Sequence, residues 1–406
     1  MTRIYKFLTI FFMLPVLTIL AATIVFCAEA DPEDGEDPLL GVREGWSWPV
    51  VVVQPPEGWE SERGRAIKLA MRTAERELSL ERDAIRGREV TFMYSDLSDI
   101  KEIKTRLSTW RGMKVAAIVT FADTEFSSAL AEQCAESGPS LIFAEGEDAS
   151  INSQGTGRPH SYLFALDLPY YARANALAEI AALERPGEIA AVFTDILSGR
   201  LARGAQLTLG FLEEREMIPI EISASAFTQD QFSPQVRELE SGGTKVYICW
   251  LDAMATLSIW QNLERRHAES IVLFSGPQRR ILTDADGILL VDQNVLLERN
   301  EKGRGVIINL IRDAFNVVVD DPVTAARAYA LAKWVIEAFR EVGSGDVPGI
   351  ASALGRVNGI PLMDEILSID QATHRPQSRK FGLLRIGNRR FESYGSVEVF
   401  SSEAVE

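Results

Sequence analysis

Residue types that carry metal or redox chemistry are few in this chain and widely spaced. The histidines are His160, His267 and His374, and neither an H-E-x-x-H nor a C-x-x-C pattern occurs. In those patterns two side chains lie close enough to hold a metal ion or to exchange electrons. We interpret Cys134 and Cys249 as two separate buried thiols, with a disulfide as the alternative. The sequence therefore predicts no metal site.

Two glycine-rich stretches come close to the spacing of nucleotide-binding loops. Gly199–Gly204 has the length of a phosphate-binding loop, but Gly204-Ala205-Gln206 lacks the lysine that contacts the phosphates. Gly155-x-Gly157 lacks a third glycine, and Pro159 follows where a helix would have to begin. No G-x-S-x-G nucleophile motif occurs. We therefore expect no cofactor and no enzymatic activity.

Acidic residues are abundant, and pairs such as Asp284/Asp286 and Asp320/Asp321 have the composition of a general acid–base pair. The chain has 58 acidic and 42 basic residues, however, so such pairs are common in it, and turns or helix caps are their more usual role. The net charge of −16 repels nucleic acids and anionic lipids, and no run of Lys or Arg offsets it locally. We expect no nucleic-acid partner.

The N-terminus has the pattern of an export signal. Arg3 and Lys6 precede an apolar run over residues 7–26, and Ala28-Glu29-Ala30 supplies the small residues of a cleavage site. We predict that residues 1–30 form a signal peptide that is cleaved after Ala30. The protein would then be exported to the periplasm or another extracytoplasmic compartment.

Two other interpretations of this segment stay open. The apolar run is long enough for an uncleaved membrane anchor. Cys27 could carry a lipid, although Phe26 stands where a lipoprotein signal has a small residue. Residues 31–45 are acidic, rich in Pro and Gly and without periodicity, so we expect a flexible leader there.

From residue 50 onward, strand-like and helix-like segments alternate. The predicted strands are 50–53, 89–94, 115–120, 140–143, 162–165, 189–194, 218–223, 245–250, 270–274 and 287–291. The predicted helices are 61–80, 99–110, 124–136, 170–183, 201–216, 234–240, 253–267 and 324–342. This order predicts an α/β fold with parallel sheets and helices on both faces. Near the C-terminus we predict strands over 367–370, 382–386 and 390–394, with a hairpin turn at Gly387-Asn388.

Four stretches of the sequence share an order and spacing that spans about residues 46–395. They are Pro56-x-Gly58 with Gly64 and Leu69-Ala70; Thr194–Gly199 with Gly204; Phe227–Pro234 followed by Lys245–Trp250; and Ile369–Pro376. Together they resemble the substrate-binding proteins of branched-chain amino-acid ABC transporters, which have the type I periplasmic-binding fold.

The resemblance implies two doubly wound parallel-sheet lobes, joined by a three-crossover hinge, with a solute bound in the cleft between them. Lobe one would comprise residues 46–165 plus 290–365, and lobe two residues 166–289 plus 366–395, followed by a tail over 396–406. The predicted sheets agree with this site, because open α/β sheets bind ligands outside the carboxyl ends of their strands. Closure of the lobes around the solute would be the working motion.

In lobe one, three loops after strands provide candidate ligand-binding residues. Trp59 either caps the solute with its ring or packs on its own lobe. Asp123 and Thr124 match the positions at which the family holds the ligand's carboxylate; Thr124 can donate a hydrogen bond, and we expect Asp123 to cap the following helix. Glu145 and Glu147 stand where the family has small residues, and they either pair with a cationic group or form a solvated acidic loop.

In lobe two, Ser198 stands where the family often has a tyrosine that stacks on the solute. Trp250 is our candidate for an apolar wall, and Asp252 for the carboxylate that binds an ammonium group. Gln278 would close the far edge of the cleft. These differences from the family argue against a branched-chain amino acid as the solute.

The sequence therefore predicts an exported, non-enzymatic substrate-binding protein of an ABC-type transporter. It would capture a small polar, amino-acid-like solute and present it to a membrane permease, as a monomer or weak dimer. The alternative is a sensor ectodomain or an envelope interaction protein on the same fold, whose cleft no longer binds an amino acid. A cleft with apolar walls and convergent polar groups would indicate the first, and an apolar patch on an outer face the second.

Overall fold

The computed structural model describes residues 47–81, 85–144, 159–166, 170–195, 199–223, 232–263, 270–275, 279–292, 301–362, 365–376 and 380–398. The predicted signal peptide and leader, and the tail beyond residue 398, lie outside these residues. Within the described ranges, no helix has both the length and the apolar character needed to cross a bilayer.

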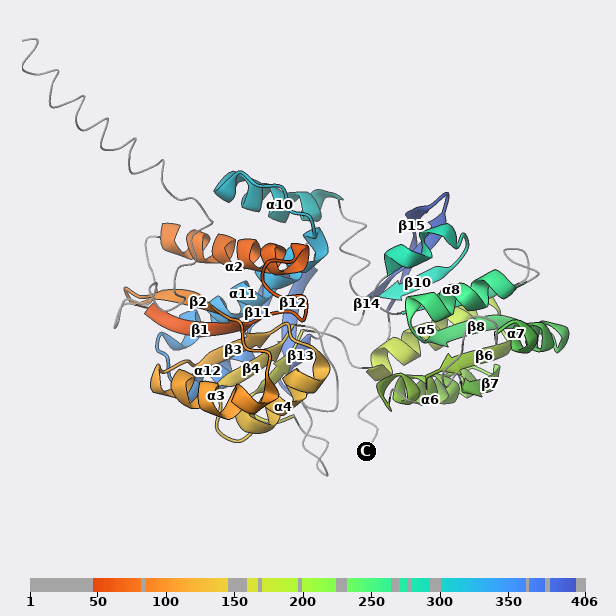
Figure 1. Cartoon of the computed structure of the whole chain (residues 1–406), viewed down its shortest axis with the longest axis horizontal. Helices are drawn as coiled ribbons and strands as arrows, with labels where there is room; N and C mark the ends of the chain where they lie inside the picture. Colours follow the sequence, from red (N-terminus) through yellow and green to blue (C-terminus); the bar gives the residue numbers. More distant parts are fainter. Residues whose placement is uncertain are drawn as a thin grey trace, which may run out of the picture. The chain divides into compact units, whose positions relative to one another are not determined.

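The first sheet has five parallel strands in the order β2-β1-β3-β4-β5 (Figure 1). The strands are β1 (Ser47–Val53), β2 (Glu89–Ser95), β3 (Ala117–Thr120), β4 (Ser140–Phe143) and β5 (Leu163–Ala165). Successive side chains of a strand point to opposite faces, and in β1 Val50 and Val52 belong to one core whereas Val51 and Val53 belong to another. Burial on both faces explains why this strand is continuously apolar.

Helices cover both faces of this sheet. One face packs against α2 (Glu62–Leu80), α11 (Pro322–Val342) and α12 (Val347–Leu354), and the other against α3 (Ile103–Gly112) and α4 (Thr124–Cys134). A short 3-10 helix, η1 (Ile100–Glu102), leads into α3, and α10 (Glu301–Phe315) packs on α2 and α11. Each helix thus buries an apolar face against the sheet or its neighbours.

The second sheet has seven strands in the order β15-β14-β10-β9-β8-β6-β7. They are β6 (Ile189–Thr194), β7 (Ile218–Ser223), β8 (Thr244–Trp250), β9 (Ile271–Phe274), β10 (Leu289–Asp292), β14 (Lys380–Gly387) and β15 (Arg390–Glu398). The first five are parallel, whereas β14 pairs antiparallel with β10 and β15 antiparallel with β14. One face packs against α5 (Tyr170–Glu184) and α6 (Gly199–Glu213), and the other against α7 (Phe232–Ser241), α8 (Ala253–Asn262) and the 3-10 helix η4 (Arg279–Asp284).

The last hairpin forms with its turn one residue later than predicted. Gly387 pairs with Arg390, so the two turn residues are Asn388 and Arg389, with φ of 51° and 60°. Positive φ at both central positions is the geometry that matches the twist of a two-residue hairpin. Asn tolerates this region better than most residues, which fixes the turn at this position.

A third, three-stranded sheet changes the predicted division of the chain. It consists of β11 (Asn358–Leu362), β12 (Glu365–Asp370) and β13 (Arg375–Pro376). Ile369 lies in the same core as β1, and the Ala165 N–H donates to the His374 carbonyl at 3.2 Å. Ile369 and His374, which the sequence assigned to lobe two, therefore contact the first sheet and its core.

Lobe one is the first sheet with its helices and the three-stranded sheet, within residues 47–166 and 301–376. Lobe two is the seven-stranded sheet with its helices, within residues 170–292 and 380–398. The chain passes from lobe one to lobe two after β5, returns to lobe one after β10, and passes to lobe two again after β13. It thus crosses between the lobes three times, as predicted.

Candidate ligand-binding site

Both lobes have the feature that creates ligand sites in open α/β proteins, an edge at which parallel strands end and helices begin. Ligands of such sheets bind outside this carboxyl edge. In lobe one the edge carries the loops after β1, β3 and β4, and in lobe two the loops after β6, β8 and β9.

The loop after β1 folds back onto the start of α2, and its carbonyl groups come very close to Gly64. A Cβ added to Gly64 would lie 2.4 Å from the Gly58 carbonyl oxygen and 2.6 Å from that of Trp59. Ser61 closes the same turn, because its Oγ accepts from the Gly64 N–H at 2.9 Å and donates to the Gly58 oxygen at 2.7 Å. Only glycine lets the loop fold so tightly onto the start of α2, which explains this part of the opening motif.

Trp59 packs on its own lobe, one of the two roles that the sequence left open. Its indole N–H donates to the Ser95 carbonyl at 3.1 Å. The Tyr94 ring meets it edge-on at 5.3 Å, and the Lys68 ammonium lies 5.4 Å from the ring centroid. The side chain is partly buried, so Trp59 forms a fixed, partly exposed surface at this edge.

Asp123 caps α4, as predicted. Its Oδ1 accepts from the Phe126 N–H at 2.9 Å, and the residue is exposed. Behind it, the buried Thr120 and Ser127 hydroxyls lie 3.1 Å apart and brace the loop. A carboxylate thus occupies the positive end of α4, where it opposes the binding of a ligand carboxylate.

Arg327 was not singled out from the sequence. It lies in the second turn of α11, is 3% exposed, and its Nη2 donates to the carbonyl of Ala144, directly after β4. Asp321 caps the same helix by accepting from the Thr324 N–H at 3.1 Å. A buried cation with a backbone acceptor fixes the end of β4 against α11. A lone Arg in a run of Ala, Tyr and Leu is the signal that could have identified it.

Trp250 differs from the prediction that it forms a wall of the site. Its ring is 2% exposed and packs beneath α6, where its indole N–H donates to the Thr208 hydroxyl at 2.9 Å. Gly204 makes room for it, since a Cβ there would come within 2.4 Å of the ring. The ring therefore belongs to the core of lobe two and does not form a wall of the site.

Asp252 lies at the carboxyl edge of lobe two, in the exposed loop between β8 and α8. Its Oδ1 accepts from the Ala255 N–H at 2.7 Å, so the carboxylate caps α8. Met254, in the first turn of α8, is 52% exposed. This edge thus combines a positioned carboxylate with an exposed apolar side chain, a pairing that suits a ligand with a cationic and an apolar part.

The other predicted site residues are not described. Glu145, Glu147, Ser198 and Gln278 lie outside the described residues, and of Thr124 only the main chain, at the start of α4, is described. The ligand roles of these five residues stay predictions.

The described residues show no group of three or more His, Cys, Asp or Glu side chains that could hold a metal ion. Cys134 and Cys249 are separate, buried free thiols, as predicted, and burial raises the pKa of each to about 12. A thiol with such a pKa stays protonated near neutral pH and is a poor nucleophile.

No protein-family model and no curated protein matches the sequence. Solved structures do match it. The leucine-binding protein LivK of Thermotoga maritima superposes with a TM-score of 0.67 at 16% identity, covering 86% of this chain and 99% of that one. An ABC transporter substrate-binding protein of Desulfitobacterium hafniense in complex with Leu gives 0.68 at 12% identity, covering 86% and 100%.

A third structure broadens the chemistry of the matching proteins. A solute-binding protein of an ABC transporter from R. palustris, in complex with 4-hydroxybenzoate, superposes with a TM-score of 0.67 at 15% identity, covering 87% of this chain and 97% of that one. At such identities the likeness establishes the fold. The chain has the type I periplasmic-binding fold, with two parallel-sheet lobes, as the sequence predicted.

Proposed function

We propose that this protein is the exported solute-binding component of an ABC-type transporter. The observation that carries the proposal is the fold, which covers 86% of this chain and nearly the whole length of two solute-binding proteins. The solute would bind between the carboxyl edges of the two lobes, and closure about the three crossovers would enclose it. A membrane permease would be the partner, and no catalytic step is required.

We further propose that the solute is small, polar and amino-acid-like, with an ammonium group. The support is electrostatic: Asp123 and Asp252 place carboxylates at the two edges, and each caps a helix. Capping carboxylates satisfy the N–H groups and the helix dipole that would otherwise attract an anion. Met254, exposed in the first turn of α8, would contact an apolar part of the solute.

Thermal unfolding of the chain without residues 1–30, against amino acids, polyamines, amides, short peptides and sugars, tests solute binding. A solute at 100 times its dissociation constant adds about 2.7 kcal/mol to the free energy of unfolding. One chemically coherent class of hits is the expected result. A flat response across the panel would contradict solute capture.

The role of Asp252 can be separated from its role as a helix cap. Asn caps helices about as well as Asp, so Asp252→Asn removes the charge and keeps the cap. We expect this variant to weaken binding of an ammonium-bearing solute by about 2–5 kcal/mol, as loss of one partner of a buried charge pair does. Asp346→Asn is the matched control, because Asp346 caps α12 in the same way at 2.8 Å. Unchanged affinity in Asp252→Asn would remove Asp252 from the site.

A second candidate function is supported by a different observation. Ile218 and Ile220 on strand β7 are 56% and 36% exposed on the outer edge of lobe two. Exposed apolar side chains at an edge are typical of a surface that binds another protein. A flat solute panel together with capture of a protein partner through this strand would favour an envelope interaction protein.

A further inference from the structure

Lobe one contains an open cavity that is separate from the carboxyl edges. Its volume is about 280 Å³, slightly below the range usual for ligand sites. It is lined by Ser161, Tyr162, Pro348, Ala351, Ser352, Gly355, Gln371 and His374. All of these residues belong to lobe one: to the segment before β5, to α12 and its end, and to the turn after β12.

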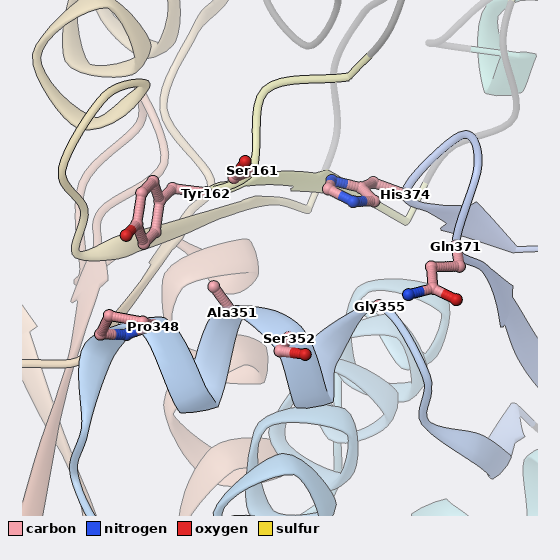
Figure 2. A pocket seen from close by; sticks show the side chains of 8 residues that line it. All are labelled: Ser161, Tyr162, Pro348, Ala351, Ser352, Gly355, Gln371 and His374. Atoms are coloured by element: carbon pink, nitrogen blue, oxygen red, sulfur yellow. The ribbon is translucent and has the colours of Figure 1, made fainter.

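Helix α12 forms the floor because its side chains there are small. Pro348, Ala351, Ser352 and Gly355 recur at the three- and four-residue spacing that places side chains on one helix face. Figure 2 shows Tyr162 and Pro348 at one end of the cavity and Gln371 and His374 at the other. The space is therefore elongated along the helix.

The segment before strand β5 and His374 form the wall, and His374 is held against that strand. The imidazole Nδ1 lies 2.9 Å from the Leu163 carbonyl, and the ring stacks on Phe164 at 4.4 Å with 14° between the planes. Burial lowers the pKa of His374, against the raising effects of Leu163, His160 and Asp370, and so favours the neutral ring. A carbonyl can only accept, so Nδ1 is the donor in the tautomer that makes the hydrogen bond to Leu163. The wall thus offers a rigid, uncharged heteroaromatic group.

The chemistry of the lining indicates the charge of the ligand. Hydroxyl, amide and imidazole groups alternate with Pro348 and Ala351, and none of the residues that line the cavity bears a full charge at neutral pH. Arg356 donates to the Ser352 hydroxyl, but its guanidinium is already paired with Glu341 at 2.7 Å. The nearest acid is Asp370, which acts on His374 but does not line the cavity, and its Oδ1 already accepts from the Ala372 N–H at 2.8 Å. An anionic ligand would lose hydration here without gaining a counter-ion, and a cationic one would find a carboxylate only beside the cavity, whereas an uncharged ligand can exchange water for these hydrogen bonds.

We infer that this cavity is a second binding site, for a small, uncharged, planar molecule with an apolar ring and an amide or hydroxyl end. The ring would lie along the small face of α12, between Tyr162 and His374. The polar end would meet the amide of Gln371. The site is independent of the proposed solute site, because every residue in it belongs to one lobe and none lies at a carboxyl edge loop.

Three ring compounds of one shape and different charge test this inference: benzamide, benzoate and benzylamine. We expect benzamide to bind the full chain at millimolar concentration in a ligand-observed NMR titration, and the two ions to bind at least tenfold more weakly. Ser352→Phe fills the cavity from an exposed position and should abolish benzamide binding. Ser108→Phe, at an exposed position of α3, is the matched control and should bind benzamide as the parent does.

Gln371→Ala removes the amide at the end of the cavity. This variant should bind benzamide several-fold more weakly, and the melting temperature of the free protein should not change. Absence of benzamide binding in the parent, or equal binding in Ser352→Phe, would overturn the site. Equal binding of all three compounds, lost together in Ser352→Phe, would overturn the uncharged class of ligand. If benzoate binding persists in Ser352→Phe, benzoate binds at another site. The effect of Ser352→Phe on benzamide binding then decides whether the cavity is a site.

Discussion

Glu75 is a carboxyl group that α2 directs towards strand β2. Its Oε1 accepts the N–H of Phe92, and burial raises the pKa of this carboxyl to about 7, against the lowering effects of that hydrogen bond and of Arg72. The folded protein therefore holds a proton between pH 4.5 and about 7 that the unfolded chain releases. Stability consequently falls as pH rises through this window.

We predict that Glu75→Gln removes this dependence on pH. Gln keeps an oxygen for the Phe92 N–H and carries no charge to bury, so the variant should be more stable than the parent at pH 8 by about 1–3 kcal/mol. Urea unfolding at pH 5 and pH 8 measures the difference. Glu132→Gln, exposed on α4, is the control for loss of one negative charge. Equal effects of the two variants on stability would show that burial of the Glu75 carboxylate is not the cause.

Gly204 and Gly210 lie on the same helix in opposite situations. An added Cβ would come within 2.4 Å of the buried Trp250 ring at Gly204, but meets nothing within 4 Å at Gly210. We predict that Gly204→Ala destabilises the protein by about 1–3 kcal/mol through overpacking. Gly210→Ala should stabilise it by roughly 0.5–1 kcal/mol, because Ala favours a helix more than Gly does. Chemical denaturation measures both, and a tolerated Gly204→Ala would contradict the close packing described.

Among the elements, strand β7 shows how an open sheet edge is protected. The Ile218 N–H donates to the main-chain carbonyl of Glu188, next to β6, at 3.3 Å. Because successive main-chain groups of a strand point to opposite sides, the nitrogen of Pro219 points to the open side. Proline has no N–H, and the edge therefore lacks a donor at this position. The opposite edge, β15, carries a bulge at Tyr394, between Ser393 and Gly395, which interrupts its regular pairing.

We predict that Pro219→Val promotes self-association. The substitution restores an outward N–H beside the exposed Ile218 and Ile220, which together offer a pairing edge to a second copy. Sedimentation velocity should show a dimer whose fraction grows with protein concentration. At equal concentration, the dimer fraction should be at least tenfold larger than in the parent. Ser223→Val, at the same outward register of β7, is the control. If Pro219→Val stays monomeric, the missing N–H of Pro219 is not what prevents pairing at this edge.

Elements with a strong local pattern could be predicted from the sequence, and those that depend on distant contacts could not. The run Val50–Val53 identifies a strand because both of its faces are buried. Helix α10 was missed, since Gly303 and Gly305 near its start are poor helix formers. The placement of β12 and β13 in lobe one depends on partners such as β5, far away in the chain, which no local pattern encodes.

The candidate site was predictable to a similar degree. Asp123 and Asp252 each lie between a predicted strand and a predicted helix, and this pattern places them at the carboxyl edges. Asp123 caps its helix as expected. The burial of Trp250 could not be foreseen, because it depends on Gly204 in a neighbouring helix. Arg327 escaped notice for the same reason, since its acceptor lies 183 residues away.

For the molecule as a whole, the proposed function requires that solute binding changes the shape of the protein. Three crossovers connect two sheets that each have their own cores, so closure can proceed without breaking either core. A solute that contacts both lobes binds the closed form more tightly and shifts the population towards it.

We therefore predict that a saturating solute from the thermal panel compacts the chain without residues 1–30. Small-angle X-ray scattering should show the radius of gyration falling towards the roughly 21 Å expected for a compact chain of this length. Asp252→Asn should need a higher solute concentration for the same compaction, because the substitution weakens binding and leaves the lobes intact. An interaction protein on this fold would show no change with any solute. Binding without compaction would place the solute on one lobe alone, and the hinge would then have no part in capture.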